Sequence, residues 1–144
     1  MPHSPRWHEG KLWMLNSGAG ELCVVDTDAG SYTPVCALPG FLRGLCFVRH
    51  YALVGLSQIR QSNLFGGLPI KDRFDRLLCG ICVIDLRDGR QVGTIEFTSG
   101  LHELYDVQFI PGVSRPAILL PTDADARRTI TSATIAYWLR PEPS

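Results

Sequence analysis

Three polar side chains occupy equivalent positions in an internal repeat of the sequence. His3, Arg43 and Tyr105 each stand at the start of a short stretch that is followed by a turn and then by an apolar run. All three are able to bind a ligand, and their equivalence predicts that they meet at the mouth of a central channel. The alternative is that they are buried hydrogen-bonding residues that pin the strands on which they lie.

Other polar residues are expected on the same face. Asn16, Glu103 and Asp106 carry the hard oxygen atoms that a divalent cation prefers, and a bound divalent cation is the alternative. Because the sequence has no recognisable calcium loop, neither a metal site nor a cofactor is predicted. His102 beside Glu103 could act as an acid/base pair. The full set of candidate ligand-binding residues is His3, Asn16, Arg43, Arg60, His102, Glu103, Tyr105 and Asp106.

The positions of the Cys thiols and Ser hydroxyls in the sequence indicate structural rather than chemical roles. Cys79 and Cys82 form a C-x-x-C without a second pair, and residues three apart in a strand point to opposite faces, so we interpret them as small buried hydrophobes rather than a redox or metal site. Ser17 and Ser57 are equivalent in the repeat, which favours hydroxyls that cap turns over nucleophiles. No G-x-S-x-G, phosphate-binding loop or dinucleotide fingerprint is present.

Short apolar runs separated by Gly and Pro signals predict the elements that must position these residues. Such a pattern is typical of an all-β sandwich, barrel or propeller. A repeat favours the propeller, because Leu22–Gly30 matches Ile81–Gly89 at a separation of 59 residues, with an apolar run, an Asp and a turn Gly in each copy. A second repeat relates residues 4–7, 44–47 and 106–109.

Together the repeats predict one propeller-like domain over residues 1–144, with about two and a half four-stranded antiparallel blades. Blade one covers 3–40, blade two covers 41–100 with an insertion at 58–77, and a partial third blade covers 101–138. The β-branched stretch from Arg128 to Trp138 suits a third strand of the last blade, and a helix from Thr122 or Asp123 is the weaker alternative. The insertion is expected to be a lid over the channel or an arm that grips the next chain.

Composition excludes several classes of function. The chain has 14 acidic and 14 basic residues, so a nucleic-acid or acidic-membrane partner is not expected. No apolar run reaches the length of about 18 residues that a membrane helix needs, and residues 1–8 lack the apolar core of a signal peptide. The five cysteines are an odd number, which indicates reduced thiols and a cytoplasmic location.

Five motifs resemble an uncharacterised bacterial family of conserved hypothetical proteins with a domain of unknown function. The family is similar to six-bladed propellers of the strictosidine synthase and gluconolactonase type, so the resemblance implies a fold and little chemistry. It also implies that typical members are longer and that this chain matches their C-terminal part, and it implies Lys where Gln58 stands. The motifs are residues 1–7, 15–18, 39–45, 54–57 and 103–107.

A partial propeller leaves open strand edges and apolar faces. We therefore expect a homo-oligomer, with a dimer as the first choice, that completes the ring; a partner chain with the missing half is the rival. The expected function is a non-catalytic binding or interaction module. Fold analogy leaves open a metal-assisted hydrolase of the lactonase or esterase type, and a truncated gene product without specific activity is the third hypothesis.

Overall fold

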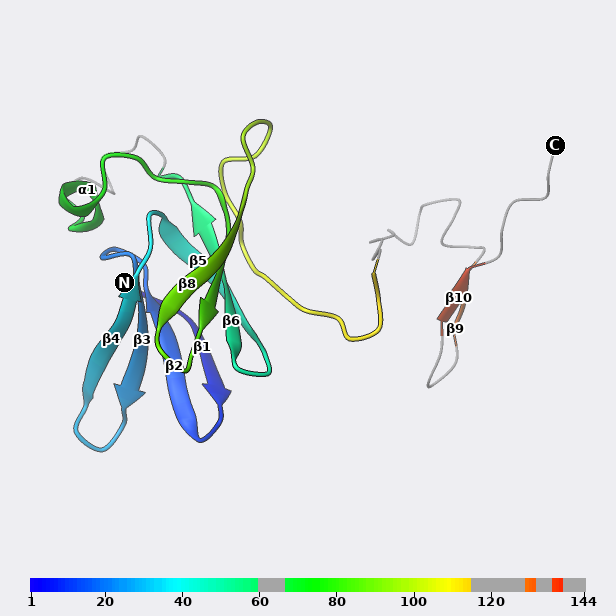
Figure 1. Cartoon of the computed structure of the whole chain (residues 1–144), viewed down its shortest axis with the longest axis horizontal. Coiled ribbons are helices and arrows are strands. Elements are labelled where there is room, and N and C mark those ends of the chain that lie inside the picture. The colour runs from blue at the N-terminus through cyan, green and yellow to red at the C-terminus, as the bar shows by residue number, and fades with distance from the viewer. Residues whose placement is uncertain (60–66, 115–128, 132–135, 139–144) are drawn as a thin grey trace. The chain divides into compact units, whose positions relative to one another are not determined.

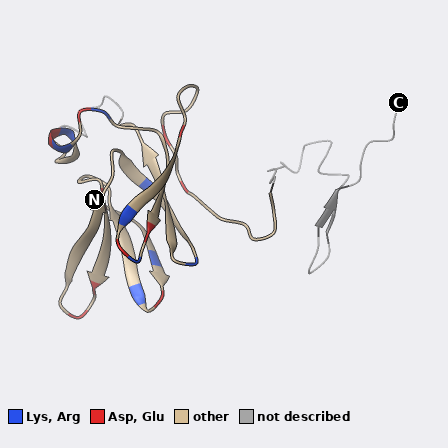
Figure 2. Cartoon of the chain, viewed as in Figure 1, with Lys and Arg blue, Asp and Glu red and all other residues tan. Residues whose placement is uncertain are grey.

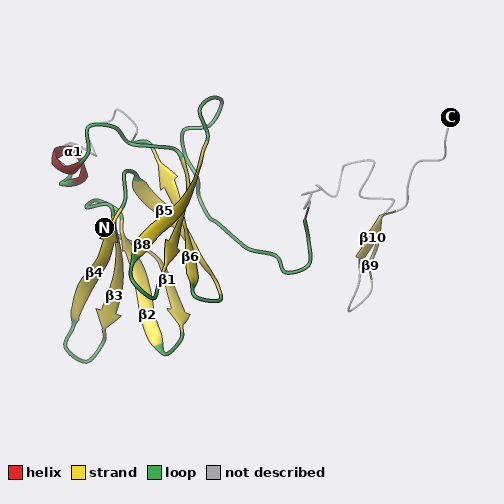
Figure 3. Ribbon diagram, viewed as in Figure 1, coloured by secondary structure: helices red, strands yellow, loops and turns green. Residues whose placement is uncertain are grey.

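The computed structural model describes residues 1–59, 67–114, 129–131 and 136–138, and nearly all of their regular structure is β-sheet (Figures 1 and 3). This confirms the all-β class. The first four strands form one antiparallel sheet in chain order, and the next four form another. The bounds are β1 Pro2–His8, β2 Lys11–Asn16, β3 Glu21–Asp26, β4 Ser31–Ala37, β5 Phe41–Val48, β6 Tyr51–Ser57, β7 Gly80–Asp85 and β8 Arg90–Glu96.

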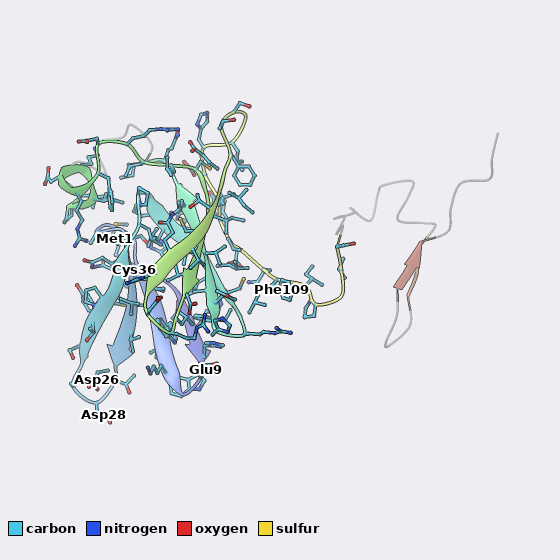
Figure 4. All side chains as sticks on the ribbon, in the orientation of Figure 1. Met1, Glu9, Asp26, Asp28, Cys36 and Phe109 are labelled. Atoms are coloured by element: carbon cyan, nitrogen blue, oxygen red, sulfur yellow. The ribbon has the colours of Figure 1, made fainter. Side chains whose placement is uncertain are left out.

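The two sheets repeat one another in structure as they do in sequence. β3 and β7 begin 59 residues apart, as do β4 and β8. Asp26 Oδ1 accepts hydrogen bonds from two amides of its own turn, at the tip of the β3–β4 hairpin (Figure 4), and Asp85 Oδ1 accepts one from the amide of Arg87. Gly30 and Gly89 close these turns with φ values of 63° and 73°. The prediction of matched Asp–Gly turns is confirmed.

A shared apolar core joins the two sheets. β1 and β2 of the first sheet lie beside β5 of the second. Burying each large aliphatic side chain contributes about 1.5–3 kcal/mol, so this interface accounts for much of the stability of the unit. The buried members are Trp13, Leu15, Leu22, Leu38, Leu42, Leu45, Ala52, Val54, Leu56, Cys82 and Ile84.

A bulge near the start of β5 brings a third segment close to the second sheet. The register of β5 against β6 shifts between Leu42 and Leu45, and Gly44 at the shift has a φ of 78°. A Cβ atom on Gly44 would lie 2.4 Å from the backbone nitrogen of Val107. Only glycine tolerates both this conformation and this approach, so the bulge holds the segment around Val107 against the sheet.

The described part of the insertion packs on the first sheet of its own chain. Its helix α1 (Ile70–Arg73) buries Ile70 completely, and the Ile70 amide donates to the Gly18 carbonyl at 3.0 Å. The Arg73 guanidinium donates to Glu21 Oε1 at 2.7 Å. The insertion therefore links the second sheet to the β2–β3 turn, a role that neither the lid nor the arm hypothesis included.

The segment expected to begin a third blade is less regular than predicted. The structure assigns no strand to residues 101–114, although the sequence predicts one at 106–109. Hydrogen bonds from the end of β6, rather than a strand ladder, hold residues 102–104. The Ser57 side chain bonds to the backbone of Leu104, and the Gln58 amide donates to the His102 carbonyl at 2.8 Å.

Contacts within the chain group residues 1–109 in one compact unit and residues 110–144 in a second. In the second unit β9 (Thr129–Thr131) and β10 (Ala136–Trp138) pair antiparallel. The range 128–138 thus contains two short strands instead of the one predicted. The expectation of a helix from residue 122 lies outside the described residues.

Candidate functional site

A cavity of about 110 Å³ opens at the end of the second sheet where β5 begins and β6 ends. Residues 103–105 close its other side. Its walls combine two aromatic rings, an aliphatic side chain, a cation, an acid and two neutral polar groups. The lining residues are Phe41, Arg43, Ser57, Gln58, Ile59, Glu103 and Tyr105.

Arg43 lies close to two aromatic rings of the cavity. Its guanidinium carbon lies 5.6 Å from the centroid of Phe41 and 5.3 Å from that of Tyr105. Both distances allow a cation–π attraction. Within the described part of the chain no hydrogen bond or ion pair engages this guanidinium, and its Nε–H is buried without an acceptor. A buried donor without an acceptor costs about 1–3 kcal/mol, so an acceptor that reached this Nε–H would bind favourably.

An open depression adjoins the cavity. It shares Gln58, Ile59, Glu103 and Tyr105 with the cavity and adds residues 100–102, among them His102. The His102 Nδ1 and Gln58 Oε1 atoms lie 3.0 Å apart, so a neutral ring in contact with this oxygen carries its hydrogen on Nδ1. The His102–Glu103 pair predicted from the sequence therefore lines the rim of the site, with the imidazole tied to Gln58.

His3 is not among the residues that line the cavity, but it contacts Phe41, which is. Its ring meets Phe41 edge-on, with centroids 5.5 Å apart, and its Nδ1 lies 2.8 Å from Ser17 Oγ. The single hydroxyl hydrogen of Ser17 is donated to the Leu42 carbonyl at 2.6 Å, so His3 Nδ1–H is the donor to Ser17. This arrangement makes His3 a residue that positions Phe41 and thereby Arg43.

The remaining candidates from the sequence lie away from the cavity. Asn16 Nδ2 donates to Glu21 Oε2 at 3.0 Å, and Asp106 lies 3.6 Å from Arg6 and accepts from Gln108. Among the described residues no three His, Cys, Asp or Glu side chains gather as a metal site would require. Arg60 lies outside the described residues.

Phe41, Ser57, Gln58 and Ile59 line the cavity but are absent from the predicted set of ligand-binding residues. The sequence could have predicted Phe41 as a lining residue. Phe41 precedes Arg43 by two positions, and residues two apart in a strand point to the same face. Gln58 and Ile59 follow the end of β6, and only their approach to residues 103–105 makes them part of a site.

The cysteines offer no reactive group in the described structure. All five are free, and Cys23, Cys46, Cys79 and Cys82 are buried. Burial raises the pKa of the Cys23 thiol and that of the half-buried Cys36 to about 11. A thiolate is the nucleophilic form, so these thiols are poorly suited to redox or covalent chemistry.

The fold and the site define an all-β protein in which two four-stranded antiparallel sheets share a core and carry an arginine-containing cavity at one end. The chain belongs to the family described as Domain of unknown function (DUF4915), whose model matches residues 1–119. A comparison with curated proteins found no match. No helix within the described ranges is long and apolar enough to cross a membrane.

Proposed function

We propose that this protein is a non-catalytic module that binds a small anionic ligand, such as a carboxylate, in the cavity around Arg43. The observation that carries the proposal is the Arg43 guanidinium, which lies within cation–π distance of both Phe41 and Tyr105 and whose Nε–H has no acceptor among the described residues. A planar guanidinium matches a carboxylate through two parallel hydrogen bonds. The rings fix its orientation and reduce the entropy lost on binding.

The hydroxyls near the cavity support a binding role over a hydrolytic one. Ser17 donates to the Leu42 carbonyl, and Ser57 both donates to and accepts from the backbone of Leu104. A serine nucleophile needs a neighbouring base to take its proton, whereas both of these protons are engaged by carbonyl oxygens.

A thermal-shift titration tests the proposal. Acetate, benzoate and succinate are compared with acetamide and benzamide at constant ionic strength. We expect saturable stabilisation by at least one carboxylate, reaching about 2.7 kcal/mol at a ligand concentration of 100 times Kd, and none by the amides. Arg43→Gln should abolish it. Arg90→Gln is the matched control, because Arg90 is exposed and lies next to Asp88.

Equal stabilisation of the wild type and Arg43→Gln would contradict the proposal, as would the absence of a response to every carboxylate. A response that persists in Arg43→Gln but is lost in Arg90→Gln would place the anion elsewhere on the surface.

We further propose that the two sheets are neighbouring blades of a β-propeller. The proposal is supported by the four-strand antiparallel order of both sheets, by their shared core and by the offset of 59 residues between their outer strands. An experimental structure in which the two sheets do not radiate from one axis would refute it. A cytoplasmic location, where free thiols persist, fits the same proposal.

A further inference from the structure

The outer face of the first sheet carries an apolar row that crosses all four strands. The strand registers place Trp7 opposite Leu12, Leu12 opposite Val25, and Val25 opposite Tyr32. Since Trp13, next to Leu12, faces the shared core, this row lies on the other side of the sheet. Trp7 is 70% exposed and Tyr32 is 48% exposed. We call these four residues the outer row.

The second sheet has an equivalent face, which packs against the first sheet. Three of its residues at the equivalent positions, Phe47, Ala52 and Ile84, contribute to the shared core, whereas Gln91, the equivalent of Tyr32, is exposed. Ala52 and Ile84 are completely buried there, and the Phe47 ring stacks on His8 with centroids 4.2 Å apart. The outer row therefore has the residue types that the repeat buries against a neighbouring sheet. The equivalent pairs are Trp7 and Phe47, Leu12 and Ala52, and Val25 and Ile84.

The outer face of the second sheet is partly covered by the same chain. A Cβ atom on Gly55 would lie 3.0 Å from Val107 Cγ2, so Val107 packs on this face. Hydrogen bonds from Ser57 to Leu104 and from Gln58 to His102 hold the covering segment in place. A second copy that docked head-to-tail on this face would have to displace the segment.

The outer row is self-complementary, because its order is aromatic, aliphatic, aliphatic, aromatic. A two-fold axis parallel to the strands would place β1 on β4 and β2 on β3 of a second copy. Trp7 would then pack on Tyr32 of that copy, and Leu12 on its Val25. Figure 2 shows charged residues near the ends of β1 to β4, and Lys11 and Asp26 there line the same depression as Trp7, Leu12 and Val25. In the two-fold arrangement Lys11 of one copy would lie near Asp26 of the other, so these charges are of opposite sign across the interface.

We propose that two copies of this chain form a closed dimer by packing the outer rows of their first sheets face to face. Such an isologous interface buries both faces at once and leaves no surface for further growth. The proposal does not depend on the Arg43 cavity, which lies at the second sheet. It differs from ring closure, in which the two copies would meet head-to-tail.

The test is the mass of the full chain in solution, measured by light scattering and sedimentation over a range of concentrations. We expect a dimer for the wild type. Trp7→Lys should raise the dimer dissociation constant at least about tenfold, because a charge would replace a large aromatic ring within an apolar interface. Leu12→Lys should do the same. Since Trp7 is mostly exposed, Trp7→Lys should keep the circular dichroism spectrum of the wild type.

Ile95→Glu is the matched control. Ile95 is 56% exposed and lies opposite Ile81, on the outer face of the second sheet. This variant should remain dimeric. A wild type that is monomeric at every concentration would overturn the proposal. So would a dimer that Ile95→Glu dissociates as strongly as Trp7→Lys does, since that result would indicate head-to-tail association.

Discussion

The hydroxyl of Ser57 accepts a hydrogen bond from the amide of Leu104 at 2.8 Å and donates one to the carbonyl of the same residue at 3.2 Å. One side chain at the end of β6 thus fixes the segment that carries Tyr105. We expect Ser57→Ala to lower the free energy of unfolding by about 1–3 kcal/mol, because it leaves both backbone groups without their partner. Urea unfolding measures this change, and carboxylate binding at Arg43 should weaken with it.

Ser17 provides the matched comparison, because it occupies the equivalent position and donates to the Leu42 carbonyl. Ser17→Ala should reduce stability by a similar amount, and its effect on binding should come through His3 and Phe41. If Ser57→Ala is as stable as the wild type, the hydroxyl does not fix the segment in solution.

Gly44→Ala should be strongly destabilising. The new methyl group would overlap the backbone of Val107 in a residue that already has a positive φ, and we expect a loss of more than about 2 kcal/mol. Gly10→Ala is the control. Gly10 has a φ of 73° but no atom within 4 Å of the added Cβ, so only the backbone cost of about 1 kcal/mol applies. Equal losses in the two variants would refute the close approach of Val107.

Ile70→Ala tests the packing of the insertion on the first sheet. Ile70 is completely buried against the β2–β3 turn, and its truncation should lower the free energy of unfolding by about 2–5 kcal/mol. Lys71→Ala, at an exposed position of the same helix, should change it by less than about 0.5 kcal/mol. A neutral Ile70→Ala would mean that the helix does not dock on the sheet in solution.

Asp85 should make stability depend on acid pH. Hydrogen bonds from the Arg87 guanidinium lower the pKa of the Asp85 carboxyl from 3.8 to about 2. Because the pKa is lower in the folded state, the Asp85–Arg87 pair stabilises the fold above pH 4, and this contribution is lost as the pH falls from about 4 to about 2. Asp85→Asn should flatten the acid side of a plot of stability against pH in this window.

Asp26→Asn is the control for Asp85→Asn, because it alters the equivalent turn of the first sheet and leaves the Arg87 pair intact. It should lower stability without removing the acid transition that depends on Asp85. If Asp85→Asn and the wild type lose stability in parallel between pH 4 and pH 2, the ion pair does not form in solution.

The sequence by itself determined the features that depend on neighbouring residues. Alternating apolar positions and Asp–Gly turns specify strands and hairpins, because side-chain direction and turn geometry are set within a few residues. The repeat also marked Ser17 and Ser57 as equivalent hydroxyls. Arg43 and Tyr105 were selected for the same reason, and both line the cavity.

Only the tertiary structure decided which surfaces meet. The burial of Ile70 on a turn about 50 residues earlier, the placement of Arg43 close to Phe41 and Tyr105, and the separation of Asn16 from the cavity all depend on long-range packing. No local pattern encodes such contacts. They form because many weak apolar and polar interactions together exceed the entropy lost when distant segments are brought side by side.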